Sequence, residues 1–228
     1  NTDTGSSSGP DLVLHRKSTS SAADSDGLGR IDFRGLNDAN EDINYATIYS
    51  KISDASDGTE DGEFYIQQIS NGSYVTTLKI DGIGAVTKPL QPAFGAYKGS
   101  TQTNPALSTL TTVTFGTELF DKNADFDLSS DTFTAPVTGI YQLNASATLQ
   151  NLDTAATYYR IVIATSNQNF WTITTPKFSA DVADFHHSIS VTADMDANDT
   201  ALLRIFFADG TQQADIGAET YFSGALLC

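Results

Sequence analysis

The clearest pattern of apolar and polar positions lies between Tyr141 and Leu149, where every second residue is apolar and the residues between are polar. Such period-two alternation predicts a strand with one buried face. Gly139, shortly after Pro136, is typical of a turn that feeds the strand, where glycine supplies backbone freedom. The expected inward positions are Tyr141, Leu143, Ala145, Ala147 and Leu149.

Shorter apolar alternations occupy the first 88 residues, separated by clusters of Asp, Gly, Ser and Asn. They predict five or six brief strands joined by turns. Their apolar content is thin, and a monomer of about 88 residues would bury too little surface to be stable alone, so we expect oligomerisation. The alternations are Leu12–Leu14, Ile31–Phe33, Tyr45–Ile48, Phe64–Ile66 and Leu78–Ile80.

Composition also favours an all-β fold. Residues typical of strands are plentiful, proline is sparse, and the spacing of an amphipathic helix is rare. No apolar run approaches the roughly 20 residues that cross a bilayer, and no leader opens the chain. Because the chain begins at Asn1 rather than Met, we expect a processed chain or a fragment, so a missing leader does not indicate location.

The formal charge of −16 is spread along the chain, with 14 acidic against 7 basic residues over 1–88 and 14 against 5 over 89–228. An acidic surface disfavours nucleic acid and anionic membranes as partners and favours solubility. Cys228 is the single cysteine, so no intrachain disulfide is expected. It is expected to be a free thiol, although three chains that converge there could bring their thiols together.

Six residues at fixed spacing resemble the signature of the complement C1q globular head, a trimeric relative of the tumour necrosis factor jelly roll. Pro92–Ala96 resembles the first strand of that family and Tyr221–Leu227 its last, whereas Leu143 and Ala145 stand where the family prefers aromatic residues. The resemblance implies a ten-stranded-type jelly-roll sandwich over residues 89–228 and a homotrimer. The six residues are Phe115, Asp121, Phe126, Phe133, Gly139 and Tyr141.

Residues 1–88 resemble modules of phage tail fibres and tailspikes more loosely. These modules precede a C-terminal domain and form part of a trimeric shaft. A short joint with two prolines, Lys88–Pro92, then leads to the head. The resemblance implies a β-rich shaft over 1–88. The motifs lie at Leu12–Arg16, Gly29–Gly35, Tyr45–Ile48, Asp54–Gly62 and Leu78–Gly82.

Two acidic segments mimic part of a calcium loop. Asp121–Asp127 has Phe126 where the sharp turn needs glycine and Thr132 where a bidentate Glu is expected, and Asp194–Asp199 fails in the same way. Asp199 instead matches a turn of the C1q family. We therefore expect solvated acidic turns, with no metal and no cofactor.

Catalysis is also disfavoured. Asp54–Glu63 holds five carboxylates, the groups that glycoside hydrolysis uses, but a loop so charged stays wet and does not raise a carboxyl pKa. His186 and His187 are adjacent, so on a strand they point to opposite faces and cannot chelate one ion. The sole tryptophan, Trp171, shares an alternating pattern with Ile173, which favours a place in the core or at a subunit interface over ligand contact.

These features predict a non-enzymatic attachment protein of a phage virion, a tail fibre or similar appendage, located outside the cell. The expected partners are two further copies of itself, other virion fibre or tail proteins, and a glycan or protein receptor on the host surface, with no membrane insertion. A secreted bacterial C1q-like adhesin or lectin module is the alternative, and a polysaccharide depolymerase tailspike is a weaker one.

Strand parity predicts where such a head would bind. In this family the chain enters and leaves the head at one end, so the loops Asn151–Thr157, Lys177–Phe185 and Ala208–Glu219 should share the opposite end, with the Asp199 turn at the base. Loops on a rigid sheet commonly carry function. Their short polar side chains suit sugar hydroxyls, although they could be solvated turns. The candidate receptor-binding residues are Asn151, Asp153, Asp181, Asp184, Asp209, Gln212, Gln213 and Asp215.

Overall fold

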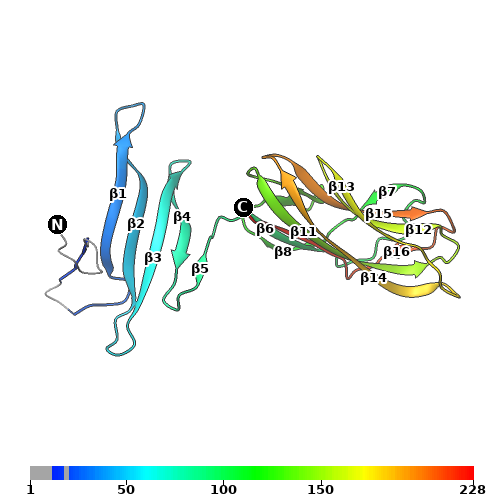
Figure 1. Cartoon of the computed structure of the whole chain (residues 1–228), viewed down its shortest axis with the longest axis horizontal. Helices are drawn as coiled ribbons and strands as arrows, with labels where there is room; N and C mark the ends of the chain where they lie inside the picture. The colour runs from blue at the N-terminus through cyan, green and yellow to red at the C-terminus, as the bar shows by residue number, and fades with distance from the viewer. Residues whose placement is uncertain (1–11, 18–20) are drawn as a thin grey trace, which may run out of the picture. The chain divides into compact units, whose positions relative to one another are not determined.

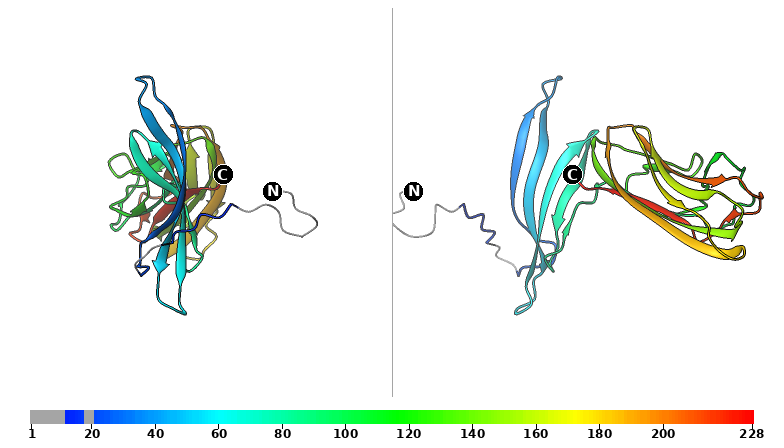
Figure 2. Two further views of the ribbon diagram at one scale, coloured as in Figure 1. Left: turned by 90° about the vertical axis from the view of Figure 1, so that its left-hand side faces the viewer. Right: turned by 45° about the vertical axis from the view of Figure 1, so that its right-hand side comes forward.

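The computed structural model of the chain describes residues 12–17 and 21–228. These residues form strands and loops only, which confirms the predicted all-β class. In this part of the chain no helix is long and apolar enough to cross a membrane. The chain divides into two compact units, Asn1–Leu90 and Gln91–Cys228, called here the N-terminal sheet and the head. Figure 2 shows the first as a single layer and the second as two facing layers.

The N-terminal sheet is antiparallel, and its five strands lie in chain order. Four predicted alternations fall within its strands, which are longer than expected, because adjacent polar residues also pair. The prediction of a strand at Leu12–Leu14 was wrong, since this segment pairs with no neighbour. The strands are β1 (Gly27–Leu36), β2 (Asp42–Asp54), β3 (Asp61–Ser70), β4 (Ser73–Ile80) and β5 (Val86–Thr87).

The two faces of this sheet differ in chemistry. The register places Ile31 opposite Ile48, and Ile48 opposite Ile66, so that apolar side chains share one face. Phe33 on this face is 53% exposed, so the sheet does not bury its own apolar side. The opposite face carries ion pairs, of which the closest joins Lys79 Nζ to Glu63 Oε1 at 2.6 Å.

The head is a sandwich of two six-stranded sheets (Figure 1), which confirms the predicted jelly roll. One sheet, called here the outer sheet, runs β13 (Asn169–Thr174), β12 (Tyr158–Thr165), β15 (Thr200–Ala208), β10 (Thr132–Thr134) and β9 (Phe126–Asp127), with β7 (Leu110–Thr112) also on β15. The second runs β14 (Val182–Met195), β11 (Gly139–Leu152), β17 (Tyr221–Leu226), β6 (Ala93–Tyr97) and β8 (Thr117–Asp121), with β16 (Asp215–Ile216) also on β11.

The core of the head follows the predicted alternation. All five inward positions of β11 are buried. The ring of Phe94 stacks on Phe133 with 4.6 Å between centroids and on Phe126 with 5.1 Å. Phe94 thus joins the signature aromatics into one cluster, to which Phe115 and Tyr141 also belong.

Two sequence interpretations change. Gly139 does not have the positive φ of a turn glycine; instead, a Cβ there would lie 2.5 Å from the Cys228 carbonyl oxygen and 2.7 Å from Leu226 Cδ1, so glycine is needed for space. Trp171 is 56% exposed and Ile173 46%, so within one chain neither lies in the core. They alternate as expected, but on the outward face of β13.

The first and last strands of the head, β6 and β17, pair with each other, with Ala93 opposite Ala225. The chain therefore enters the head, and completes its last strand, at the same end (Figure 1). Gly139, at the start of β11, lies at this end, because the Ile140 amide donates to the Cys228 carbonyl. The Asp199 turn lies here too, since its carbonyl accepts from the Ala135 amide.

Candidate functional site

Loops from four parts of the head meet at the end opposite the paired termini of β6 and β17. The register sets Leu152 opposite Val182 and Tyr158 opposite Ala208, so the segments that follow or precede these residues share this end. A fourth segment, between β6 and β7, joins them through a bridge from Gln102 to Ile216. We call segments 98–109, 151–157, 175–181 and 209–220 the far-end loops.

Asp153 holds two of these loops together. Its Oδ1 accepts the Ala155 amide at 2.7 Å, its Oδ2 accepts the Thr211 amide, and its carbonyl accepts the Tyr159 hydroxyl at 2.8 Å. The backbone hydrogen bonds, led by that from Thr211, lower the pKa of Asp153. Asp153 is only 6% exposed, so its carboxylate organises the loops rather than facing a receptor.

Asp181 connects three loops. Its Oδ1 accepts the amide and the hydroxyl of Thr154 at 3.0 and 3.1 Å, and its Oδ2 accepts Gln213 Nε2 at 2.9 Å. These contacts, with the Thr154 amide first, lower the pKa of Asp181. Gln213 Nε2 also donates to the Asn151 carbonyl at 3.2 Å.

Asp215 links the loop after β15 to the segment between β6 and β7. Its Oδ1 accepts the Asn104 amide at 2.8 Å, and its Oδ2 accepts Asn151 Nδ2 at 3.2 Å. Gln212 Nε2 donates to the Asn104 carbonyl at 2.6 Å. Asn104 and Asn151 have φ of 48° and 53°, a conformation that asparagine tolerates better than most residues.

The remaining two predicted residues are less central. Asp209 Oδ2 accepts the Thr157 hydroxyl at 3.0 Å at the exposed rim of the cluster. Asp184 was expected in a loop, but it lies within β14, where the ladder with β11 continues further than its polar sequence suggests; its Oδ1 accepts Gln150 Nε2 at 2.9 Å.

Sequence reasoning did not place Asn104, Thr154 and Thr211 as functional partners. Asn104 belongs to the segment that joins β6 to β7, and its partner Asp215 is 111 residues away in the sequence. No local sequence pattern predicts such a contact. The Asn104–Pro105 pair signals only a turn.

The far-end loops form a preorganised array of amides and carboxylates. Asp153 and Asp181 have lowered pKa values, so both stay ionised near neutrality and are poor general acids. Fixed acceptors and amide donors of this kind suit the hydroxyl groups of a sugar or polar groups of a protein.

The acidic segments considered as metal sites have other engagements. Asp121 accepts the amides of Asp125 and Phe126 at 3.1 and 2.8 Å, which folds the turn between β8 and β9. Across the part of the chain that the structure describes, no three His, Cys, Asp or Glu side chains are grouped to share a metal ion.

The adjacent histidines point to opposite faces, as predicted. His186 Nδ1 is hydrogen-bonded to the Thr148 hydroxyl at 3.0 Å. The two ring nitrogens of His187 are hydrogen-bonded to the hydroxyls of Thr172 and Thr174 at 2.9 and 2.8 Å, and these contacts join β14 to β13. Burial lowers the pKa of His187.

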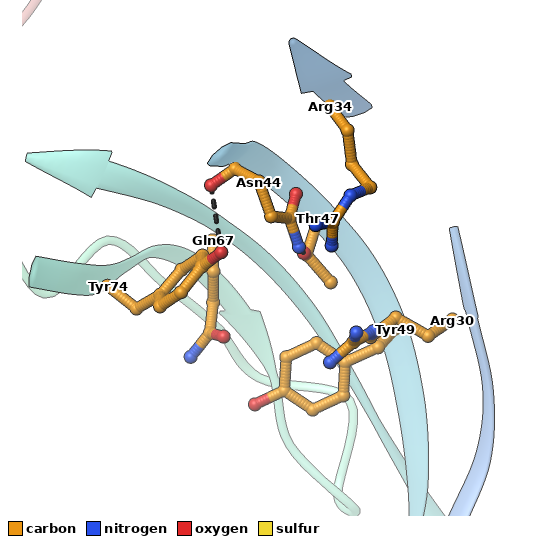
Figure 3. A pocket seen from close by; sticks show the side chains of 7 residues that line it. All are labelled: Arg30, Arg34, Asn44, Thr47, Tyr49, Gln67 and Tyr74. Atoms are coloured by element: carbon orange, nitrogen blue, oxygen red, sulfur yellow. Dashed lines mark hydrogen bonds between the residues drawn. The ribbon is translucent and has the colours of Figure 1, made fainter. Parts of the chain in front are cut away.

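A polar cavity of about 320 Å³ lies on the polar face of the N-terminal sheet. Figure 3 shows its side chains, with Arg30 and Arg34 from β1, Asn44, Thr47 and Tyr49 from β2, and Gln67 and Tyr74 from β3 and β4. Each arginine already has a carboxylate partner, since Arg30 pairs with Asp32 at 2.7 Å and Arg34 with Asp42 at 2.8 Å. The cavity therefore carries no uncompensated cation.

A two-sheet jelly roll whose first and last strands pair, with its loops gathered at the other end, defines a C1q-like or tumour-necrosis-factor-like head. The family model of the C1q domain matches residues 93–227, more than half of the chain. The chain therefore belongs to the C1q domain family.

Solved structures are similar to part of this chain. The globular domain of zebrafish complement 1qA protein is 18% identical, with 60% of this chain and 98% of that chain covered and a TM-score of 0.46. Murine APRIL at pH 8.5 is 13% identical, with coverage of 60% and 99% and a TM-score of 0.45. The search of curated proteins gave no match.

Proposed function

We propose that this chain is a non-enzymatic, extracellular attachment protein whose C1q head binds a cell-surface glycan or protein receptor through the far-end loops. The observation that carries the proposal is the network that joins four separate segments into one rigid polar surface, with Asp181 and Asp215 as its central acceptors. Preorganised polar loops on a sheet scaffold lose little entropy on binding.

The protein is proposed to act as a homotrimer. Two apolar surfaces support association between copies. One is the face of the N-terminal sheet that carries Ile31 and Phe33, which are 40% and 53% exposed. The other is a shallow groove in the head lined by Phe170, Ile189 and Val191, where the sandwich is open between β13 and β14. Apolar side chains that stay exposed or half-buried together on one surface are typical of subunit contacts.

The proposed setting is a phage virion, as a tail fibre or similar appendage that also contacts other fibre or tail proteins. The support is the order of a shaft-like sheet, a proline-containing joint and a C1q head. A secreted bacterial adhesin is the alternative. Immunogold labelling of purified virions with an antibody to the head tests the setting: labelled particles support a fibre, and antigen found free in culture supernatant supports the adhesin.

The binding surface is tested by changing exposed side chains that lie outside the network around Asp153, Asp181 and Asp215. The double variant D184N/D209N should lower adsorption of the protein to its host cells at least tenfold while thermal unfolding is unchanged. The matched control is D194N/D196N, which removes the same charge from two exposed acids at the opposite end of the head. Equal adsorption by both variants would place the receptor contact elsewhere. Release of reducing sugars from host polysaccharide would instead support a depolymerase.

A further inference from the structure

The outward face of the outer sheet carries both arginines of the head. The register places Arg160 on β12 opposite Phe206 on β15, and Arg204 on β15 opposite Val162 on β12. Residues offset in this way on neighbouring antiparallel strands are diagonal neighbours on one face, and their backbones lie about 7–8 Å apart across the two strands. Trp171 is opposite Val162, on the other side of β12. The two half-buried arginine side chains thus share one face of the sheet with aromatic residues.

Neither arginine has an anionic partner. The ion pairs found among the described residues all lie in the N-terminal unit. This is unexpected in a chain with 28 acidic and 12 basic residues, in which Arg30 and Arg34 each lie against an aspartate. Two like charges side by side repel, so an anion bound between them would be favoured.

Hydrogen bonding supports the same conclusion. Nε of Arg160 and Nε of Arg204 are both shielded from solvent, and neither has a hydrogen-bond partner. Leaving a buried donor without a hydrogen bond destabilises the folded state. A carboxylate is the group that best matches the planar donor fork of a guanidinium, and because each Nε is shielded it would bind through the terminal Nη groups.

Aromatic rings fix one of the two cations in place. The guanidinium carbon of Arg160 lies 4.8 Å from the ring centroid of Tyr158, 5.8 Å from that of Trp171 and 5.9 Å from that of Phe206. A side chain held in this way gives up little freedom when it binds. The indole of Trp171, 56% exposed, remains open for stacking on an apolar sugar face.

We propose that this surface, the arginine face (Tyr158, Arg160, Trp171, Arg204 and Phe206), is a binding site for carboxylate-bearing polysaccharides of the uronic-acid type. These side chains are spread over three neighbouring strands, β13, β12 and β15, an arrangement that suits a repeating polymer. The two arginines bind carboxylates of the chain, and Trp171 stacks on a sugar ring. The arginine face and the far-end loops are separate surfaces. An experiment can therefore contradict one of the two proposals while the other still holds.

Trp171 provides a local reporter, because it is the single tryptophan of the chain. Titrating the full-length protein with sodium polygalacturonate should change its tryptophan fluorescence saturably. The fully methyl-esterified polymer, which keeps the sugar rings but loses the charges, should give no change. R160Q/R204Q should raise the dissociation constant at least tenfold. K88Q/K122Q removes the same charge from two exposed lysines outside both proposed sites and should leave the constant within twofold.

A thermal unfolding midpoint checks each variant. If R160Q/R204Q does not fold, R204K, which keeps the charge but loses the fork, should still weaken binding several-fold. Four results would overturn the proposal: no saturable change with polygalacturonate, equal binding of the esterified polymer, an equal loss in the lysine control, or equal binding of polyglutamate, which would indicate an acidic peptide ligand.

Discussion

At the scale of single residues, Gly139 shows how a signature position can be set by space. A methyl group there would meet the Cys228 carbonyl and Leu226 Cδ1 at distances that real Cβ atoms do not adopt. We expect G139A to push the end of β17 away from β11 and to lower the free energy of unfolding by about 1–3 kcal/mol. Urea denaturation measures this change. G27A is the control, because no atom lies within 4 Å of a Cβ at Gly27, and a loss of equal size there would contradict the explanation.

His187 predicts a pH effect. Burial lowers its pKa in the folded protein below the ordinary value of 6.5, so the fold favours the neutral ring. Its contribution to stability is therefore complete above about pH 6.5 and is lost as the pH falls from there through the folded pKa.

The measurement is the thermal midpoint at pH 7.5 and at pH 5. H187Q, which keeps a polar side chain that does not titrate, should lose less stability than the wild type over this interval. H186Q should retain the wild-type pH dependence, because it leaves His187 in place. An equal pH dependence in H187Q and the wild type would show that other groups set the acid response.

At the scale of elements, the far-end loops depend on Asp153. D153N keeps the size of the side chain but removes the charge that attracts the Ala155 and Thr211 amides. We expect a loss of about 1–3 kcal/mol and faster hydrogen exchange at the Thr211 amide. D209N, at the rim, should leave that exchange rate unchanged. Unaltered exchange in D153N would show that the loops are held by other contacts.

Strands with strong alternation could be predicted from the sequence, and loop assembly could not. β11 follows from Tyr141 to Leu149 alone, because inward side chains every second residue leave one register that buries them. The direction of successive strands then placed most candidate residues at one end. The contact of Asn104 with Asp215 and the burial of Asp153 depend on segments far apart in the chain. Trp171 followed the right period, but its face could not be chosen without the partner strands.

At the scale of the whole molecule, the proposed trimer gives a mass about three times the chain mass of 24.3 kDa, measurable by light scattering. I48D places a charge in the middle of the apolar face of the N-terminal sheet, so this variant should dissociate at a higher protein concentration than the wild type. T76D, on the polar face opposite Gln67, should not. A wild-type monomer at micromolar concentration would contradict the proposal.

The pairing of β6 with β17 also has a mechanical consequence. A pull between the joint and a target held at the far-end loops would act along β6, whose hydrogen bonds to β17 and β8 lie across that direction. These bonds would be strained together in shear rather than broken one after another by peeling. A head held at these two ends resists tension along its strands better than tension across them.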